Sequence, residues 1–327
     1  MKERWDWGSV DGPMSGYRYG AFGLTIESGE SISALEPSAL AFAGPADVEI
    51  SEGAVRLPKD AQIIDGVEVS VEGDSYYLSI PGCARFQVVG GRTIVVQVDR
   101  RTTRDEAHLY LLGSVFGALM HQRGILPFHC NAVEIDGSAF LFCGDSGAGK
   151  STLAAYFVER GFRLLSDDLC ALQFDRDGRL RVSGGVERLR LWRDTLEHFG
   201  RSSAELALVP GYEQKFELSL SKRNSAEPLP VVAMYHLRQA DLEREAGIFR
   251  LQGLDAANSV TANIYRRRHA DLIGAAPFYL STTERIVADI PIFSMNRNWG
   301  LAHFGREARA VEEHMRKMVE EMASTRV

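Results

Sequence analysis

One stretch, residues 139–165, constrains this chain more than any other, because it contains a complete phosphate-binding loop pattern. Gly144, Gly149, Lys150 and Ser151 satisfy G-x-x-x-x-G-K-[ST]. Glycines let consecutive backbone N–H groups turn towards an anion, and the N-terminus of the following helix adds partial positive charge. We expect the following residues to bind the phosphates: Gly144, Asp145, Ser146, Gly147, Ala148, Gly149, Lys150, Ser151 and Thr152.

The flanking residues give the loop the context that it needs. An apolar run over 139–143 predicts a buried strand entering the loop, and 152–160 has the apolar spacing of a helix. We expect Lys150 to reach the outer phosphates and the Ser151 hydroxyl to bind a bridging Mg²⁺. The sequence therefore predicts a site for ATP or a similar nucleotide with Mg²⁺.

A hairpin signal precedes the loop. Two β-like runs within 130–143 are separated by Asp-Gly at 136–137, which is typical of a two-residue hairpin turn. This register, followed back along the hairpin, places His129 opposite Gly144, the first glycine of the loop. An imidazole there can assist proton transfer, although a purely structural histidine is the alternative.

A pair of carboxylates follows the loop helix. Residues 162–165 form a short apolar strand that ends at Asp167 and Asp168, and ligands bind at the carboxyl ends of strands in open α/β sheets. Phosphoryl transfer uses one carboxylate to accept the hydroxyl proton and another to help hold Mg²⁺. We predict Asp167 as the base, within reach of His129, and Asp168 as the metal-side carboxylate; the two assignments could be exchanged. A solvated turn is the alternative.

Further charged residues are candidate contacts for the phosphates or the substrate, with solvated charge on a turn or a helix as the alternative for each. These residues are Glu187, Arg188, Arg190, Lys215 and Arg266.

The first hundred residues have the punctuated, alternating pattern of a small antiparallel β domain. An amphipathic helix follows over 105–123, and we expect it to pack beneath the nucleotide domain. We place a domain boundary between 1–103 and 104–327. Further along, 286–293 reads as a strand and 307–322 as a terminal helix. The expected N-terminal strands lie near 19–25, 48–50, 67–71, 76–80, 86–89 and 93–98.

Composition excludes several classes of protein. A net charge of −7 argues against a general nucleic-acid binder, which is normally basic. The four cysteines have no C-x-x-C spacing, so a zinc site is not expected. We see neither an apolar signal core at the N-terminus nor an apolar run long enough for a membrane span, and expect a cytoplasmic protein.

Taken together, His129, the loop GDSGAGKS and the segment ERGFRLLSDDL over 159–169 resemble the catalytic domain of HPr kinase/phosphorylase. The resemblance implies a phosphate-loop α/β fold related to ATP-dependent phosphoenolpyruvate carboxykinase. It implies that Lys150 contacts phosphate, that Ser151 binds Mg²⁺, and that the Asp pair supplies the base and the metal-side carboxylate, assisted by His129. The family transfers phosphate from ATP to a serine of a small phosphocarrier protein, and reverses this; its hexameric members suggest a homo-oligomer.

Two features depart from that family. Residues 184–200 lack the Glu-x-Arg-Gly-Leu-Gly signature linked to the phosphorylase reaction, and Cys130 replaces the glycine after the histidine. The layout, with its β-rich front, HQRGILPFH at 121–129 and YRRRH at 265–269, is more similar to HPr-kinase-related proteins of ribosomal-peptide biosynthesis, including kinases of lasso-peptide precursors.

We therefore expect an ATP- and Mg²⁺-dependent serine kinase that acts on a peptide or small protein, without nucleic-acid or membrane partners. Two alternatives remain open at this point. One is a kinase of free serine or another small hydroxylated metabolite. The other is a regulatory module that senses ATP without transferring phosphate, although a pure sensor has no need of the Asp167 and Asp168 pair.

Overall fold

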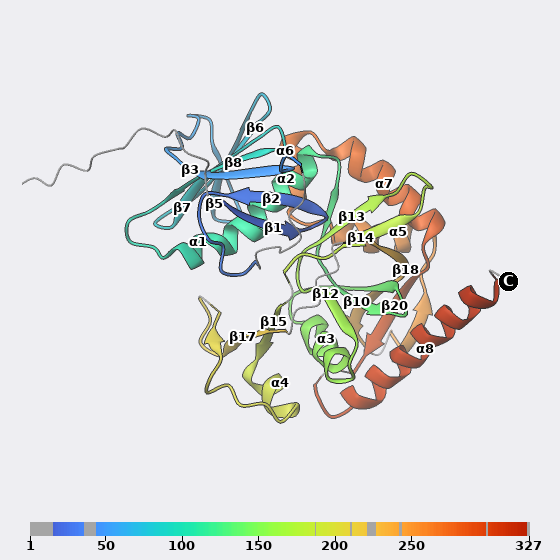
Figure 1. Ribbon diagram of the computed structural model, residues 1–327. Coiled ribbons are helices and arrows are strands. Elements are labelled where there is room, and N and C mark those ends of the chain that lie inside the picture. Colours follow the sequence, from blue (N-terminus) through green and yellow to red (C-terminus); the bar gives the residue numbers. More distant parts are fainter. Residues whose placement is uncertain are drawn as a thin grey trace, which may run out of the picture.

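The computed structural model describes residues 16–35, 44–186, 188–209, 211–220, 227–241, 244–298 and 300–325. Two large sheets divide most of this structure between them (Figure 1): an N-terminal sheet, drawn in blue to cyan, and a C-terminal sheet surrounded by helices. A third, small sheet of three strands lies beside the loop helix α3 (Lys150–Glu159).

The N-terminal sheet has eight strands in the order β1-β2-β3-β8-β7-β6-β5-β4. Its strands are β1 (Tyr17–Ala21), β2 (Leu24–Ser28), β3 (Val48–Glu52), β4 (Gln62–Ile64), β5 (Val67–Glu72), β6 (Ser75–Ile80), β7 (Ala84–Val89) and β8 (Thr93–Val98). The prediction of a purely antiparallel sheet is wrong, because β3 runs parallel to both β2 and β8. The run expected over 19–25 is a hairpin that turns at Phe22 and Gly23, both with positive φ.

The helical segment after this sheet comprises α1 (Arg104–Tyr110), a π-helical turn η1 (Leu111–Val115) and α2 (Phe116–Gln122). A capping box between Thr103 and Glu106 starts it. The apolar side chains of the segment share one buried core with the N-terminal sheet and with Leu169 and Ala171 of the C-terminal part, so the expected packing against the nucleotide domain is confirmed in part. Because α2 also contacts β9 (Leu126–Phe128) and α6 (Arg267–Ile273), the domain boundary at residue 103 stays a prediction.

The C-terminal sheet has nine strands, with β11, β18 and β20 parallel at its centre. Besides β9, its strands are β10 (Cys130–Ile135), β11 (Ser138–Cys143), β12 (Arg163–Ser166), β13 (Cys170–Phe174), β14 (Leu180–Ser183), β18 (Leu229–Gln239), β19 (Gly247–Arg250) and β20 (Ile292–Arg297). Most of the residues of β10, β11 and β18 are buried, as expected of strands covered on both faces.

Alternation along β11 divides the buried side chains between two cores. Leu141 faces α5 (Gly253–Ala262) and α7 (Ala276–Asp289), whereas Phe140 and Phe142 face α3 and α8 (Phe304–Thr325). The expected terminal helix is confirmed by α8. The strand expected over 286–293 is partly wrong, because Ile286 belongs to α7 and the strand begins only at Ile292.

The small sheet contains β15 (Arg188–Trp192), β17 (Lys215–Ser219) and β16 (Ala207–Leu208), in that order. The helix α4 (Arg193–His198) follows β15 directly. Leu189, Leu191 and Leu196 of this unit are buried in the same core as α3, which fixes the small sheet next to the phosphate loop.

The N-terminal sheet is joined to the C-terminal part by specific polar contacts. The Phe22 N–H donates to the Gly184 carbonyl at 2.6 Å, and the Tyr76 hydroxyl lies 2.7 Å from His269 Nδ1. Across the described residues, no helix is long and apolar enough to cross a membrane.

Candidate active site

The hairpin before the loop has the predicted register. Ile135 pairs with Ser138, and Cys130 pairs with Cys143. The two-residue turn between the strands has positive φ at both Asp136 and Gly137, which is the geometry of a type I′ turn. The register prediction is therefore confirmed up to the last residue before the loop.

The start of the loop is fixed from a distant part of the chain. The Gly144 N–H donates to Asn263 Oδ1 at 3.0 Å, and the Asn263 carbonyl accepts the N–H of His129 at 2.8 Å. A Cβ at residue 144 would lie 2.6 Å from the Leu237 carbonyl oxygen, so only glycine fits there. Asn263 thus holds the loop and the histidine in one arrangement. Sequence reasoning missed it, because it lies 119 residues from Gly144.

Lys150 is buried in the loop that it belongs to. Its Nζ donates to the carbonyls of Gly144 at 2.7 Å and Asp145 at 3.1 Å. Burial lowers the pKa of the ammonium group, and the carboxylates of Asp168 and Asp167 oppose that shift. A buried cation beside backbone N–H groups that point at one space is suited to bind an anion there.

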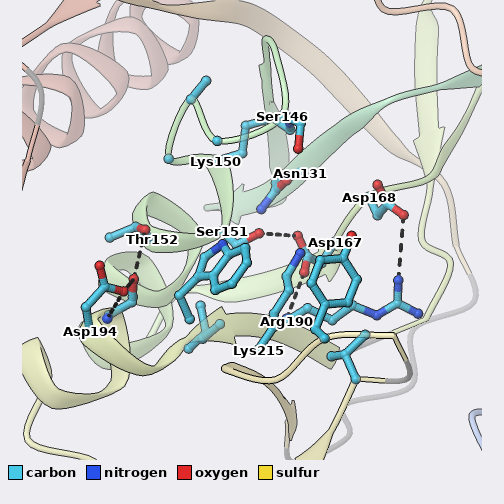
Figure 2. Close-up of a pocket in the computed structure, with 18 of the residues that line it drawn as sticks. Asn131, Ser146, Lys150, Ser151, Thr152, Asp167, Asp168, Arg190, Asp194 and Lys215 are labelled. Carbon is cyan, nitrogen blue, oxygen red and sulfur yellow. Dashed lines mark hydrogen bonds and ion pairs between the residues drawn. The ribbon is translucent and has the colours of Figure 1, made fainter.

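Asp167 extends from the end of β12 towards the loop helix. Its Oδ1 accepts the Ser151 hydroxyl at 3.2 Å, and its Oδ2 accepts the Arg190 N–H at 3.1 Å (Figure 2). Burial raises the pKa of Asp167, and the negative charge of Asp168 raises it further. The groups around Asp167 therefore do not fully offset the cost of burying its negative charge. A cation bound beside the carboxylate would offset it further.

Asp168 has a positive φ of 90°, and its carboxylate is directed to a different partner from that of Asp167. His129 Nδ1 lies 2.9 Å from Asp168 Oδ1 and 3.0 Å from the Asp168 carbonyl oxygen. Burial acts to raise the pKa of Asp168, but the hydrogen bond from His129 and the charge of Arg190 outweigh it and hold that pKa below its usual value. His129 therefore contacts Asp168, whereas the reach of His129 to Asp167 stays a prediction.

The two acceptors around His129 determine its tautomer. A carboxylate and a carbonyl both accept hydrogen bonds, so the Nδ1 atom carries the hydrogen in both contacts. In the neutral ring, Nε2 is then left with its lone pair. The ring lies beside Tyr265, with 6.2 Å between centroids, and lines the same pocket as the loop.

That pocket has a volume of about 560 Å³ and lies between the loop, the Asp pair and the small sheet. Figure 2 shows the Lys215 side chain extending from β17 towards Asp167, on the side of the pocket opposite the labelled loop residues Ser146 and Lys150. The volume is within the range of small-molecule sites. Of the candidate contacts, Arg190 and Lys215 line the pocket.

Two further candidate contacts, Arg188 and Arg266, are engaged elsewhere. Arg188 forms an ion pair with Glu217 at 3.0 Å. Arg266 donates to the Ser114 hydroxyl at 3.1 Å and lies 3.7 Å from Asp65, so it joins the C-terminal part to the N-terminal sheet. Glu187 is outside the described residues.

Two lining residues had no signal in the sequence. Arg297 is buried against the loop. If residue 149 carried a Cβ atom, that atom would lie 2.6 Å from Arg297 Nη1. Asn131 is fully buried, and within the described parts of the chain neither its amide nitrogen nor its amide oxygen has a hydrogen-bond partner. Asn131 is the second residue of β10, two positions after His129, and both line the pocket.

The site suits a Mg²⁺–nucleotide complex by the chemistry of its donors. Mg²⁺ prefers oxygen ligands and keeps several waters, so one hydroxyl and one carboxylate are sufficient protein ligands beside phosphates. Ser151 and Asp167 provide these two groups 3.2 Å apart. No cluster of three or more His, Cys, Asp or Glu side chains suited to a metal occurs among the residues that the structure describes.

Over part of its length, the chain is similar in sequence to an HPr kinase/phosphorylase and to an ATP-dependent phosphoenolpyruvate carboxykinase. No known family model matches it. The HPr kinase/phosphorylase of Treponema pallidum (strain Nichols) is 40% identical over 91 residues, which are 27% of this chain and 26% of that protein. The ATP-dependent phosphoenolpyruvate carboxykinase of Deinococcus radiodurans is 46% identical over 55 residues, or 16% of this chain and 11% of that enzyme.

A solved structure, the Hpr(Ser) kinase/phosphatase from Coxiella burnetii, aligns with a TM-score of 0.32 and 15% identity over 61% of this chain and 96% of its own. The chain spans about a quarter or less of the length of these curated relatives. The sequence matches confirm the HPr-kinase-like character predicted from the motifs. They also agree with the predicted α/β phosphate-loop fold, and the structure itself shows the β-rich N-terminal part.

Proposed function

We propose that this HPr-kinase-like chain is an ATP- and Mg²⁺-dependent kinase that phosphorylates a serine hydroxyl on a peptide or small protein. The observation that carries the proposal is that the two carboxylates beside the loop, Asp167 and Asp168, have different partners. Asp167 is directed at Ser151, and Asp168 is directed at His129. A nucleotide sensor needs only the contact between Asp167 and Ser151, whereas phosphoryl transfer also needs a group that accepts the proton of the attacking hydroxyl.

The contacts favour the exchanged assignment of the two carboxylates. Asp168 holds His129 through Nδ1, so Nε2 can accept the hydrogen of the attacking hydroxyl. The serine oxygen then bonds to the γ-phosphorus, the bond to the β-phosphate oxygen breaks, and ADP leaves. Asp168 would stabilise the positive charge that develops on the imidazole, as the carboxylate of a Ser-His-Asp triad does.

Asp167 and Ser151 are the proposed metal-side residues. Bound there, Mg²⁺ would neutralise charge on the β- and γ-phosphates. Asp167 also accepts the Arg190 N–H, which fixes its carboxylate at the base of the pocket. Lys150 and Lys215 supply positive charge towards the phosphates from opposite sides of the pocket.

The acceptor class is tested by a transfer assay with γ-labelled ATP and Mg²⁺. A serine-containing peptide encoded beside this gene, an HPr-type protein and free serine are offered separately. We expect label on the peptide or the small protein. Label on free serine alone would replace the proposal with a metabolite kinase. ATP binding without label on any acceptor would favour the sensor.

The two carboxylate roles are tested by Mg²⁺ titration of Asp167→Asn and Asp168→Asn. We expect Asp167→Asn to raise the Mg²⁺ concentration required for half-maximal transfer. Asp168→Asn should lower kcat by about 100-fold or more with that concentration little changed. The reverse pattern would restore Asp167 as the base.

A further inference from the structure

An aromatic pair lies in the pocket of the phosphate loop and takes no part in the proposed chemistry. Trp192 is the last residue of β15, and Tyr212 lies three residues before β17. Both line the pocket, and 46% of Trp192 and 47% of Tyr212 are exposed. Large apolar side chains that stay open to solvent inside a concave site indicate a ligand contact.

The fold holds this pair in place. Trp192 is paired with Lys215 in the antiparallel ladder of β15 and β17. The Trp192 and Tyr212 rings meet edge to face, with 5.7 Å between centroids and 85° between planes. Lys215 Nζ lies 5.8 Å from the Trp192 centroid and 5.2 Å from the Tyr212 centroid. The rings and the charge therefore form a preorganised surface.

The position of the pair along the pocket indicates what it contacts. Trp192 directly precedes α4, and Thr195 of that helix has its Oγ1 atom 3.4 Å from Thr152 Oγ1 in the first turn of α3. His129 and Asp168 mark the region of the transferring phosphate. Lys150 would hold the outer phosphates of a nucleotide. We infer that its nucleoside extends from there along the first turn of α3 towards the α4 side of the pocket.

We propose that Trp192 and Tyr212 bind the purine base of the nucleotide, an inference that rests on the proposed function. A flat base stacks on aromatic faces, and the nearby Lys215 ammonium adds a cation to the same surface. With the base in this place, the reacting hydroxyl would approach the γ-phosphorus from the opposite side, in line with the departing ADP.

The test separates the base from the phosphates. The affinities of the full-length protein for ATP and for inorganic tripolyphosphate, each with Mg²⁺, are measured by calorimetry. We expect Trp192→Ala to weaken ATP binding by at least about fivefold, the lower bound for loss of a stacked base. Tripolyphosphate binding should change by less than about twofold. Trp192→Phe should retain ATP affinity within about threefold, since its ring still stacks.

Phe249→Ala is the matched control, because Phe249 is an exposed aromatic residue, 42% accessible, on β19 outside the pocket. It should leave both affinities unchanged. Equal weakening of ATP and tripolyphosphate by Trp192→Ala would overturn the inference, as would no change in either. A rise confined to the KM of the acceptor would assign the pair to acceptor docking instead.

The inference and the proposed function fail in different ways. If the wild-type protein binds ATP no more tightly than tripolyphosphate, the base contributes nothing, and only the inference is overturned. If the wild-type protein binds neither ligand, the phosphate-loop assignment and the inference are both overturned.

Discussion

The phosphate-loop edge of the C-terminal sheet and the N-terminal sheet treat their buried polar groups in opposite ways. In the N-terminal sheet, the buried Ser79 hydroxyl donates to Glu68 at 2.7 Å. At the loop edge, Asn131 has no partner in the described part of the chain, and Asp167 has a raised pKa. Polar groups that the fold satisfies serve the fold, whereas unsatisfied ones are available to a ligand. The comparison supports the proposal that the chemistry takes place at the loop edge.

Removing the loop cation gives the largest expected effect. Lys150→Met should reduce phosphoryl transfer by about 100- to 1,000-fold, because it removes the buried positive charge beside the phosphates. The kcat and the ATP affinity are measured together. Lys317→Met, a change at an exposed site on α8, is the control and should leave both unchanged. If Lys150→Met kept full activity, the loop would not be the site of transfer.

A core substitution in the N-terminal sheet should affect stability and not chemistry. Phe86→Ala removes a fully buried ring and should lower the free energy of unfolding by about 3–5 kcal/mol. Ile94→Val is a milder variant of the same core, with an expected loss of about 0.5–1.5 kcal/mol. Denaturant unfolding and kcat are both measured. A fall in kcat for folded Ile94→Val protein would show that this sheet takes part in catalysis.

At the loop edge, replacing the unpartnered amide of Asn131 should stabilise the protein, whereas the core substitutions in the N-terminal sheet destabilise it. Asn131→Leu keeps the approximate side-chain volume and removes two unsatisfied polar atoms, so the free energy of unfolding should rise by about 1–3 kcal/mol. Asn296→Leu is the control, because the Asn296 amide donates to the Glu245 carbonyl and its loss should be destabilising. Destabilisation by Asn131→Leu would mean that the fold itself uses this amide.

The smallest effect concerns the coupling of the two carboxylates. The Asp167 pKa is raised first by burial and second by the charge of Asp168. Asp168→Asn removes the second cause, so Asp167 should titrate at a lower pH than in the wild-type protein. Carboxyl ¹³C chemical shifts followed against pH measure this. An unchanged or higher Asp167 pKa would show that the carboxylates are not coupled.

Local signals made much of the loop edge predictable. The loop glycines, the Asp-Gly turn at 136–137 and the strand before Asp167 depend on neighbours within a few residues, and the structure has each of them. Asn263 and Arg297 were not predictable, because they reach the loop from 119 and 149 residues away. The positive φ of Asp168 was not predicted either, because no glycine marks the position.

In the N-terminal sheet, the strands were predictable from the sequence but their pairing was not. Its strands were largely predicted, but the parallel pairing of β3 with β2 and β8 joins segments that no short-range pattern relates. The same limit explains the error near Ile286, since a short apolar run fits a strand or a buried helix equally well. Pro277, in the first turn of α7, was the available helix signal there.

A single-turnover experiment tests the central claim most directly. Wild-type protein and Asp168→Asn are each mixed, in excess, with γ-labelled ATP, Mg²⁺ and the acceptor peptide, and bound ATP and transferred label are measured in the same sample. The account predicts that both proteins bind ATP to a similar extent and that only the wild-type protein transfers the label rapidly to a serine hydroxyl. Equal transfer by both proteins, or binding without any transfer by the wild type, would contradict it.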